Sequence, residues 1–248
     1  MHCSRAVAHS RTRRLSPATS FPPRDFGVTV VGLIPARAGS KRLPDKNLVP
    51  LGGRPLLAHT CVAASESRVC TAVYVNTDSP AIAAVAEEYG VACPVLRPKY
   101  LAADDSPTRD AILFMLEFLA RRGEHYEAVI VLQPTSPLRT ADDIRAAWDL
   151  FEEHAPCEVV SVAPLVRESW AGHIGRDGRF ERRLGEEMLY RLNGAIYVHR
   201  CDDYVQDRPP RKTVAYRMPL ARSVDIDTRE DLEYAEFLVR RIRQVPVP

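Results

Sequence analysis

The 248-residue chain is predicted to adopt an α/β fold of three layers, with helices on both faces of a Rossmann-like, mostly parallel sheet. Short β-branched runs alternate along it with segments whose apolar residues recur at helical spacing. Such alternation is typical of consecutive βαβ units, because each parallel strand needs a crossover connection. Hydrophobic residues make up 46% of the chain and charged residues 27%, as in an ordinary globular protein with one sizeable core.

The individual strands and helices follow from the same patterns. The strands are predicted at residues 28–31, 71–75, 91–96, 128–132, 158–163, 194–199 and 213–218. The helices are predicted at residues 56–65, 80–89 and 140–150, and two more begin near residues 107 and 228. Capping signals mark several helix starts, namely Ser79 before Pro80, and Thr140 and Thr228 in capping boxes with Asp143 and Asp231.

Two helices show a clear apolar face. The predicted buried residues are Ile112, Met115, Leu116 and Leu119 in one helix and Leu232, Ala235, Val239 and Ile242 in the last. Segment 167–190 is instead irregular, charged and interrupted by glycines, which predicts a small hairpin or flap outside the main sheet. The sequence contains no internal repeats, so residues 27–248 are predicted to form a single domain.

Residues 1–26 differ in composition from the rest of the chain. They contain five arginines and one acid, Asp25, whereas the whole chain has a net charge of only +2. The remainder is therefore slightly acidic, which does not favour nucleic-acid binding. The tail lacks the apolar core of a secretory signal. We expect a flexible basic extension or an upstream start codon, with an organelle-targeting segment as the alternative.

Membrane partners and disulfides are not expected. No apolar run approaches the ~20 residues that span a bilayer. The six cysteines include no C-x-x-C pair and follow no secretory signal. Reduced thiols and a cytoplasmic location are the resulting expectations.

The loop at 33–51 reads L-I-P-A-R-A-G-S-K-R-L-P-D-K-N-L-V-P-L and connects the first strand to the first helix. Ligands collect where parallel strands end, and Gly39 with Ser40 allows tight turns that direct backbone N–H groups at an anion. Four cationic side chains accompany a single acid, in the order Arg37, Lys41, Arg42, Asp45 and Lys46. The loop predicts a polyanion site, most simply for a triphosphate, the alternative being a solvated basic loop.

Two carboxylates stand two residues apart in the stretch S-V-D-I-D-T at 223–228. On an extended segment Asp225 and Asp227 project to the same side. Two hard oxygen donors beside a triphosphate loop predict a site for Mg²⁺ (or Mn²⁺). The alternative is that Asp227 only caps the following helix.

The first of these motifs, I-P-A-R-A-G-S-K-R-L-P-D-K-N, closely resembles that of the acylneuraminate cytidylyltransferases, the CMP-sialic acid synthetase family. The resemblance extends over nearly all of residues 28–240 through L-R-P-K-Y-L-A-A-D-D-S-P-T, L-Q-P-T-S-P-L-R, R-L-N-G-A-I-Y-V and S-V-D-I-D-T. It implies a nucleotide-diphospho-sugar transferase-like fold and a homodimer. It also implies transfer of CMP from CTP to a 2-keto sugar acid, with release of pyrophosphate.

The resemblance further implies a role for each matched residue. The phosphates of CTP would be held by Arg37, Ser40, Lys41 and Lys46. The cytidine half would contact Asn47, Arg97 and Thr108, and the sugar would contact Gln133, Asn193 and Tyr197. Catalysis would involve Arg37, Lys46, Asp225 and Asp227, with the metal held by the two aspartates.

Simpler readings stay open for three of these residues. Thr108 could be a first-turn helix residue without a ligand, and Gln133 could hydrogen-bond within its own loop. Alternation along 191–198 predicts that Asn193, Ala195 and Tyr197 share one strand face, but Tyr197 could be an ordinary buried tyrosine.

The acceptor is left open by one departure from the family pattern. Segment 164–190 is shorter than the segment with which sialic acid members reach into the partner subunit. The predicted acceptor is a nonulosonic acid, with Kdo or a specialised-metabolite acid as alternatives. A non-catalytic nucleotide-binding regulator is the rival of a different class. A dehydrogenase is disfavoured, because no glycine-rich dinucleotide fingerprint follows the first strand.

Overall fold

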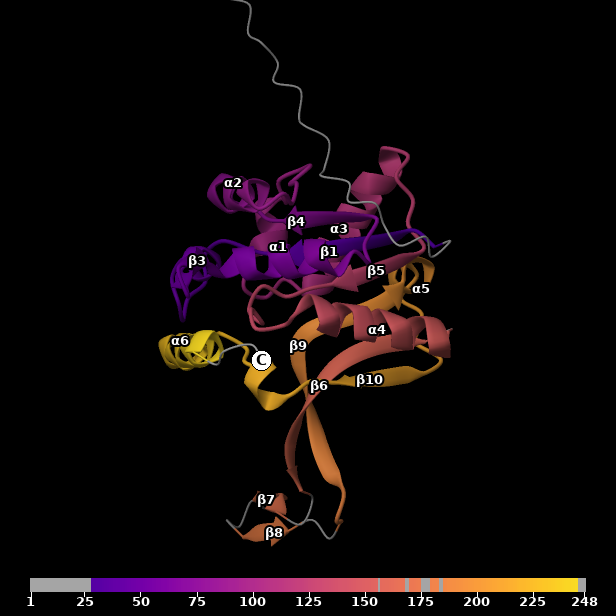
Figure 1. Cartoon of the computed structure of the whole chain (residues 1–248). Coiled ribbons are helices and arrows are strands. Elements are labelled where there is room, and N and C mark those ends of the chain that lie inside the picture. The colour runs from indigo at the N-terminus through magenta and orange to yellow at the C-terminus, as the bar shows by residue number, and fades with distance from the viewer. Residues whose placement is uncertain (1–27, 156, 168–169, 175–178, 183–184, 245–248) are drawn as a thin grey trace, which may run out of the picture.

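The computed structural model describes residues 28–155, 157–167, 170–174, 179–182 and 185–244, so the predicted tail at 1–26 lies outside it. One six-stranded sheet forms the centre of the molecule (Figure 1). Its spatial order is β10 (Thr213–Arg217), β6 (Glu158–Arg167), β9 (Met188–Arg200), β5 (Ala128–Val131), β1 (Val30–Pro35) and β4 (Ala72–Asn76).

The prediction of a mostly parallel sheet is confirmed, with one inserted antiparallel strand. β1 is parallel to β4 and β5, and β10 is parallel to β6. β9 runs antiparallel to both of its neighbours, β5 and β6, because it returns from β6 without a crossover helix. The strand predicted at 91–96 is wrong. Only Ala92 forms a bridge there, to Tyr74, and Pro94 has no N–H with which to extend the ladder.

Helices cover both faces of the sheet, which gives the predicted three layers (Figure 1). The helices α1 (Leu56–Ser67), α2 (Pro80–Glu88) and α4 (Ala141–His154) pack on one face. The helix α3 (Thr108–Arg121) and the short α5 (Cys201–Val205) pack on the other. The predicted capping boxes at Thr140 and Thr228 are both formed, so these local signals were sufficient to mark the helix starts.

The last helix, α6 (Arg229–Gln244), packs on the short strand at residues 50–51 and on loops rather than on the main sheet. Leu232, Ala235 and Val239 are buried as predicted, and Leu238 joins them. The prediction for Ile242 is wrong, because its side chain is 60% exposed. The apolar face of α6 packs on residues from both predicted motif loops, namely Leu43, Leu51, Val224 and Ile226.

Two strands continue beyond the sheet as an arm. β6 and β9 stay paired as far as Arg167 and Met188. Beyond them β7 (Gly172–Ile174) and β8 (Phe180–Arg182) form a separate antiparallel pair at the tip, far from the helices (Figure 1). This pair is the small flap predicted outside the main sheet. The shorter elements are β2 (Pro50–Leu51), β3 (Arg54–Pro55) and the 3-10 turns Lys46–Leu48, Lys99–Ala102 and Leu220–Arg222.

The cysteines of the described part of the chain behave as small core residues. All five are free thiols, and Cys61, Cys70, Cys157 and Cys201 are buried. Burial raises the pKa of Cys61 and of Cys70 to about 12, so both stay protonated and unreactive at neutral pH.

Among the described helices, none has the length and apolar character needed to cross a bilayer. The cytoplasmic location stays a prediction.

Candidate active site

A cavity of about 320 Å³ opens where β1 and β5 end, at the edge of the sheet predicted to bind ligands. Nine of the predicted site residues line it: Arg37, Ser40, Lys46, Asn47, Arg97, Thr108, Gln133, Asp225 and Asp227. Segments far apart in the sequence therefore meet at one place. Lys41, Asn193 and Tyr197 are not among the lining residues.

The two carboxylates face the cavity because their neighbours are buried on the other side. Val224 and Ile226 pack beneath α6, so the alternating Asp225 and Asp227 project into the cavity as predicted. The Ile226 backbone N–H also donates to the Thr135 carbonyl at 2.8 Å. This bond ties the aspartate segment to the loop that carries Gln133.

All four cations of the first loop are paired with carboxylates from elsewhere in the chain. Asp227 accepts from Lys46 Nζ at 2.8 Å and from Arg42 Nη2 at 2.7 Å. Asp104 pairs with Arg37 Nη1 at 2.7 Å and with Lys41, whose side chain is 78% exposed. In the fold, two carboxylates from distant segments therefore balance half of the positive charge of these four side chains.

Several polar atoms around the cavity are buried without a hydrogen-bond partner. They are Asn47 Oδ1, Arg97 Nε and Nη2, Thr135 Oγ1 and Asp225 Oδ1. Arg97 is only 6% exposed, and its nearest acid is Asp78 at 3.9 Å, so burial lowers the pKa of Arg97 despite that charge. Each unsatisfied buried group costs roughly 1–3 kcal/mol. A polar ligand would recover that free energy.

Asn47 is held by the loop that it would serve. Its Nδ2 donates to the Arg37 carbonyl at 2.9 Å, which closes the loop around a buried side chain. The amide oxygen remains without a partner, so an acceptor is available in a residue that lines the cavity. Thr108, the first residue of α3, also lines the cavity, so the reading without a ligand is less favoured.

The metal prediction can be tested against the donors that are present. Asp225 offers a buried carboxylate oxygen with no partner, and burial, reinforced by the charge of Asp227, raises its pKa. Burial alone would also raise the pKa of Asp227, but Lys46 and Arg42 hold it below its ordinary value. The capping alternative is not supported for Asp227, because the Asp231 carboxylate accepts from Asp227 N and Thr228 N.

Two carboxylates are fewer ligands than a metal site built from protein alone. Within the described ranges there is no group of three or more His, Cys, Asp or Glu side chains placed to hold a metal ion. Mg²⁺, however, is commonly bound by one or two carboxylates, with water and substrate phosphates completing its shell. Asp225 and Asp227 therefore fit the protein's share of a magnesium site that forms together with a phosphate ligand.

Gln133 is placed by a rigid loop. Buried Arg139 donates to the Gln133 carbonyl at 3.2 Å and to the Ala195 carbonyl at 2.8 Å, and burial lowers its pKa to about 10. Gly194 has a left-handed φ of +74°, and a Cβ there would lie 3.0 Å from Gln133 Oε1. The glycine thus leaves space for the glutamine.

The predicted alternation through β9 is wrong at Gly194. The left-handed residue and a register shift in the pairing with β6 place Ala195 in the same core cluster as Ile196 and Val198. Asn193 is consequently buried. It accepts from Ser161 Oγ at 2.6 Å and donates to Ser223 Oγ at 2.9 Å. These bonds connect Asn193 to the segment that carries Asp225, and its contact with a sugar stays a prediction.

Tyr197 lies on the other face of β9, packed against the α3 cluster. Burial raises its pKa, and the negative charge of Asp225 adds to the shift, so the phenol lies close to the aspartate segment. Its contact with a sugar stays a prediction.

Three polar residues that line the cavity were not predicted from the sequence, namely Asp104, Ser106 and Thr135. Thr135 belongs to the proline-bounded loop, and its hydroxyl could have been singled out there together with Gln133. Asp104 lines the cavity, whereas the adjacent Asp105 does not. No local signal separates these two acids, because their difference comes from the distant Arg37 and Lys41.

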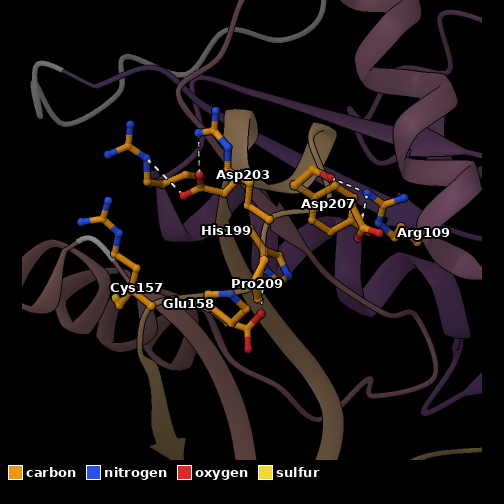
Figure 2. A pocket seen from close by; sticks show the side chains of 12 residues that line it. Arg109, Cys157, Glu158, His199, Asp203, Asp207 and Pro209 are labelled. Carbon is orange, nitrogen blue, oxygen red and sulfur yellow. Dashed lines mark hydrogen bonds and ion pairs between the residues drawn. The ribbon is translucent and has the colours of Figure 1, made fainter.

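A larger cavity, of about 740 Å³, lies at the other end of the sheet, where β6 begins and β9 ends (Figure 2). The first residues of β6, the last residues of β9 and the segment after α5 line it. Most of its charged side chains are paired with one another, in Arg109–Asp207, Arg200–Asp203 and Arg208–Asp203, and His199 Nδ1 lies 3.2 Å from the Glu158 carboxylate. None of the unpartnered buried atoms found in the described residues belongs to its lining, in contrast to the cavity where β1 and β5 end.

Known proteins were compared with this chain. A family model described as cytidylyltransferase matches residues 31–238. A CMP-N,N'-diacetyllegionaminic acid synthase of Legionella pneumophila is 36% identical over 224 residues, which cover 85% of this chain and 96% of that protein. An N-acylneuraminate cytidylyltransferase of Escherichia coli O18:K1:H7 is 36% identical over 221 residues. That alignment covers 83% of this chain but 51% of the relative, so the chain spans about half of its length.

The fold has solved counterparts as well. A CMP:2-keto-3-deoxy-manno-octonic acid synthetase complexed with CTP matches with a TM-score of 0.65 at 17% identity, covering 86% of this chain and 99% of that one. This likeness concerns the fold alone. The family model and the relatives together establish that the chain belongs to the cytidylyltransferase family, a family of nucleotidyltransferases, in the branch of the acylneuraminate enzymes that its motifs resemble.

Proposed function

We propose that this chain transfers CMP from CTP to the anomeric hydroxyl of a 2-keto acidic sugar, most specifically a nonulosonic acid, and releases pyrophosphate. The observation that carries the proposal is the meeting of three chemistries in one cavity: a cationic loop, unpartnered buried polar groups and two co-facing carboxylates. Similarity to synthases of CMP-diacetyllegionaminate and CMP-N-acylneuraminate supports the choice of acceptor class.

The residues divide the substrates between them. Arg97, Asn47 and Thr108 would bind the cytidine half, with the unpartnered polar atoms of Arg97 and Asn47 directed at the base and ribose. Arg37, Lys41 and Lys46 would neutralise the phosphates, and Ser40 would donate a hydrogen bond to them. Gln133, from the loop after β5, would orient the sugar. The anomeric hydroxyl of the sugar would then stand in line with the α-phosphorus and the leaving pyrophosphate.

The reaction then needs little covalent help from the protein. A bond forms between the hydroxyl oxygen and the α-phosphorus, the bond to the β-phosphate oxygen breaks, and pyrophosphate leaves with its charge held by the loop cations. The hydroxyl proton passes to a base. Asp225 is the cavity carboxylate with a free buried oxygen, and burial raises its pKa towards that task.

Mg²⁺ (or Mn²⁺) would be held by Asp225 and Asp227 together with the phosphates. When bound, such an ion neutralises phosphate charge and lowers the pKa of the attacking hydroxyl. Asp227 already lies between Lys46 and Arg42, so its side chain would be shared between these cations and the metal.

Pyrophosphate release measured with CTP and a panel of sugar acids tests the proposal. The panel comprises N-acylneuraminate, diacetyllegionaminate, pseudaminate and Kdo. We expect release with at least one nonulosonic acid and little with Kdo. Binding of CTP without release for any acceptor would instead favour a non-catalytic nucleotide-binding regulator.

We also propose that the chain is a homodimer whose contact involves the arm. Five large apolar side chains on the arm and at its base are each more than half exposed: Leu165, Trp170, Ile174, Phe180 and Leu192. Exposed apolar groups gathered in one place mark an interaction surface. The shortened segment 164–190 would still reach a partner, because β6 and β9 carry its tip away from the body (Figure 1).

Light scattering of the wild-type chain should give the mass of a dimer, and Trp170→Ala with Ile174→Ser should shift it towards the monomer. Tyr234→Ala is the matched control, since that side chain is 52% exposed on α6, away from the arm. A monomeric wild-type chain would contradict the proposal.

A further inference from the structure

Asp104 makes a bridge between Arg37 and Lys41, the first two cations of the loop at 33–51, which is called the phosphate loop from here on. One carboxylate oxygen lies 2.7 Å from Arg37 Nη1, and the other pairs with Lys41. The same Arg37 nitrogen donates to the Ala102 carbonyl at 3.3 Å. The segment between Arg97 and Thr108 is therefore fastened to the loop at two points through Arg37, close to the cavity that Asp104 lines.

The carboxylate presents to these cations what a phosphate group would present. It offers two negatively charged oxygens, one to each cation, as a non-bridging pair of phosphate oxygens does. The Asp104 side chain is 42% exposed, and the two cationic side chains are also accessible. Ion pairs of this kind are weak enough to be exchanged for a better anion. A triphosphate that enters the cavity must compete with Asp104 for Arg37 and Lys41.

We infer that Asp104 is an internal counter-anion: it occupies the Arg37–Lys41 pair in the empty site, is displaced by the triphosphate of CTP, and returns as pyrophosphate leaves. The inference rests on the proposed function and adds a residue that controls its affinity. While Asp104 is paired, the phosphate loop is not competent to bind. The apparent affinity for any phosphate chain is therefore reduced by the fraction of molecules in which the loop is free.

This exchange has a quantitative signature. CTP and pyrophosphate must displace the same carboxylate, so removing its charge should strengthen the binding of both by the same factor. The neighbour Asp105 offers a matched control, because it is also exposed but does not line the cavity. At physiological ionic strength an exposed charge without contacts is largely screened beyond ~8 Å.

Isothermal titration calorimetry of wild type, Asp104→Asn and Asp105→Asn with CTP and with sodium pyrophosphate, each with and without Mg²⁺, tests the inference. We expect Asp104→Asn to lower both dissociation constants roughly three- to tenfold. Asp105→Asn should change neither by more than about twofold. The ratio of the two constants should stay that of the wild-type chain.

The failures are distinguishable. If the wild-type chain binds CTP but Asp104→Asn binds no more tightly than Asp105→Asn, the counter-anion role is wrong and the proposed function stands. Weaker binding by Asp104→Asn only in the presence of Mg²⁺ would identify Asp104 as a metal ligand and likewise overturn the inference. A wild-type chain that binds neither ligand would overturn both.

Discussion

The Asp225→Asn variant is expected to turn over at least ~10²-fold more slowly than the wild-type chain. Asp225 lines the cavity, and its Oδ1 is buried without a hydrogen-bond partner. The change therefore removes the proposed metal ligand and proton acceptor while it keeps the size and shape of the side chain. Turnover should be measured at saturating CTP and sugar acid over a range of Mg²⁺ concentrations.

Two controls separate this loss from misfolding. The melting temperature of Asp225→Asn should be close to that of the wild-type chain, and Mn²⁺ binding in the presence of CTP, followed by electron paramagnetic resonance, should weaken. Asp227→Asn should also lose activity, because it removes a carboxylate of the proposed metal site and the ion-pair partner of Lys46 and Arg42. Near-normal turnover in both single variants would rule out the paired carboxylates as the metal site.

Replacement of Lys46 by Ala should lower kcat by about 10²-fold, as expected when a charge that stabilises the transition state is removed. The ammonium group is held in place: its side chain is 14% exposed and lies 2.8 Å from Asp227. Charge that develops on departing pyrophosphate is felt mainly in the transition state, so kcat should fall more than the affinity for CTP.

Arg42→Ala provides the matched comparison for Lys46→Ala. Arg42 pairs with the same aspartate at 2.7 Å, but it is 68% exposed and does not line the cavity. Its loss should change kcat only a fewfold. Such a difference would show that Lys46 acts by contact with the phosphates and not only by holding Asp227 in place. Equal losses in the two variants would mean that both act through Asp227.

Gln133→Ala should affect the other substrate. It removes neutral hydrogen bonds, each worth roughly 0.5–1.5 kcal/mol, so the KM for the sugar acid should rise while CTP binding is preserved. Steady-state kinetics in which each substrate is varied separately would measure this. Weaker CTP binding with an unchanged KM for the sugar would show that Gln133 belongs to the nucleotide half.

The predictions that succeeded depended on local patterns. The caps at Thr140 and Thr228 are each formed within four residues, and Asp225 and Asp227 owe their common direction to simple alternation. The loop after the first strand was identified because its cations and small residues lie together in the sequence. The family resemblance supplied the remaining site assignments, most of which line one cavity.

The failures depended on pairing between distant segments. The alternation rule placed Asn193 on the face of Tyr197, but Gly194 adopts a left-handed conformation and turns the amide into the core. Asp104 and Asp105 are indistinguishable in sequence, and only the fold brings one of them to Arg37 and Lys41. Residues at 91–96 lose their strand because a proline interrupts the ladder at the edge of the sheet.

The position of α6 has a consequence for the order in which the protein becomes active during synthesis. Its apolar face packs on Leu43 and Leu51 near one end of the chain and on Val224 and Ile226 near the other. Domains acquire their structure as the chain emerges from the ribosome. The phosphate loop is among the first described segments to emerge from the ribosome, whereas α6, which packs on it, is the last described helix to emerge. A nascent chain that lacks α6 should therefore carry every cation of the loop and still bind no nucleotide.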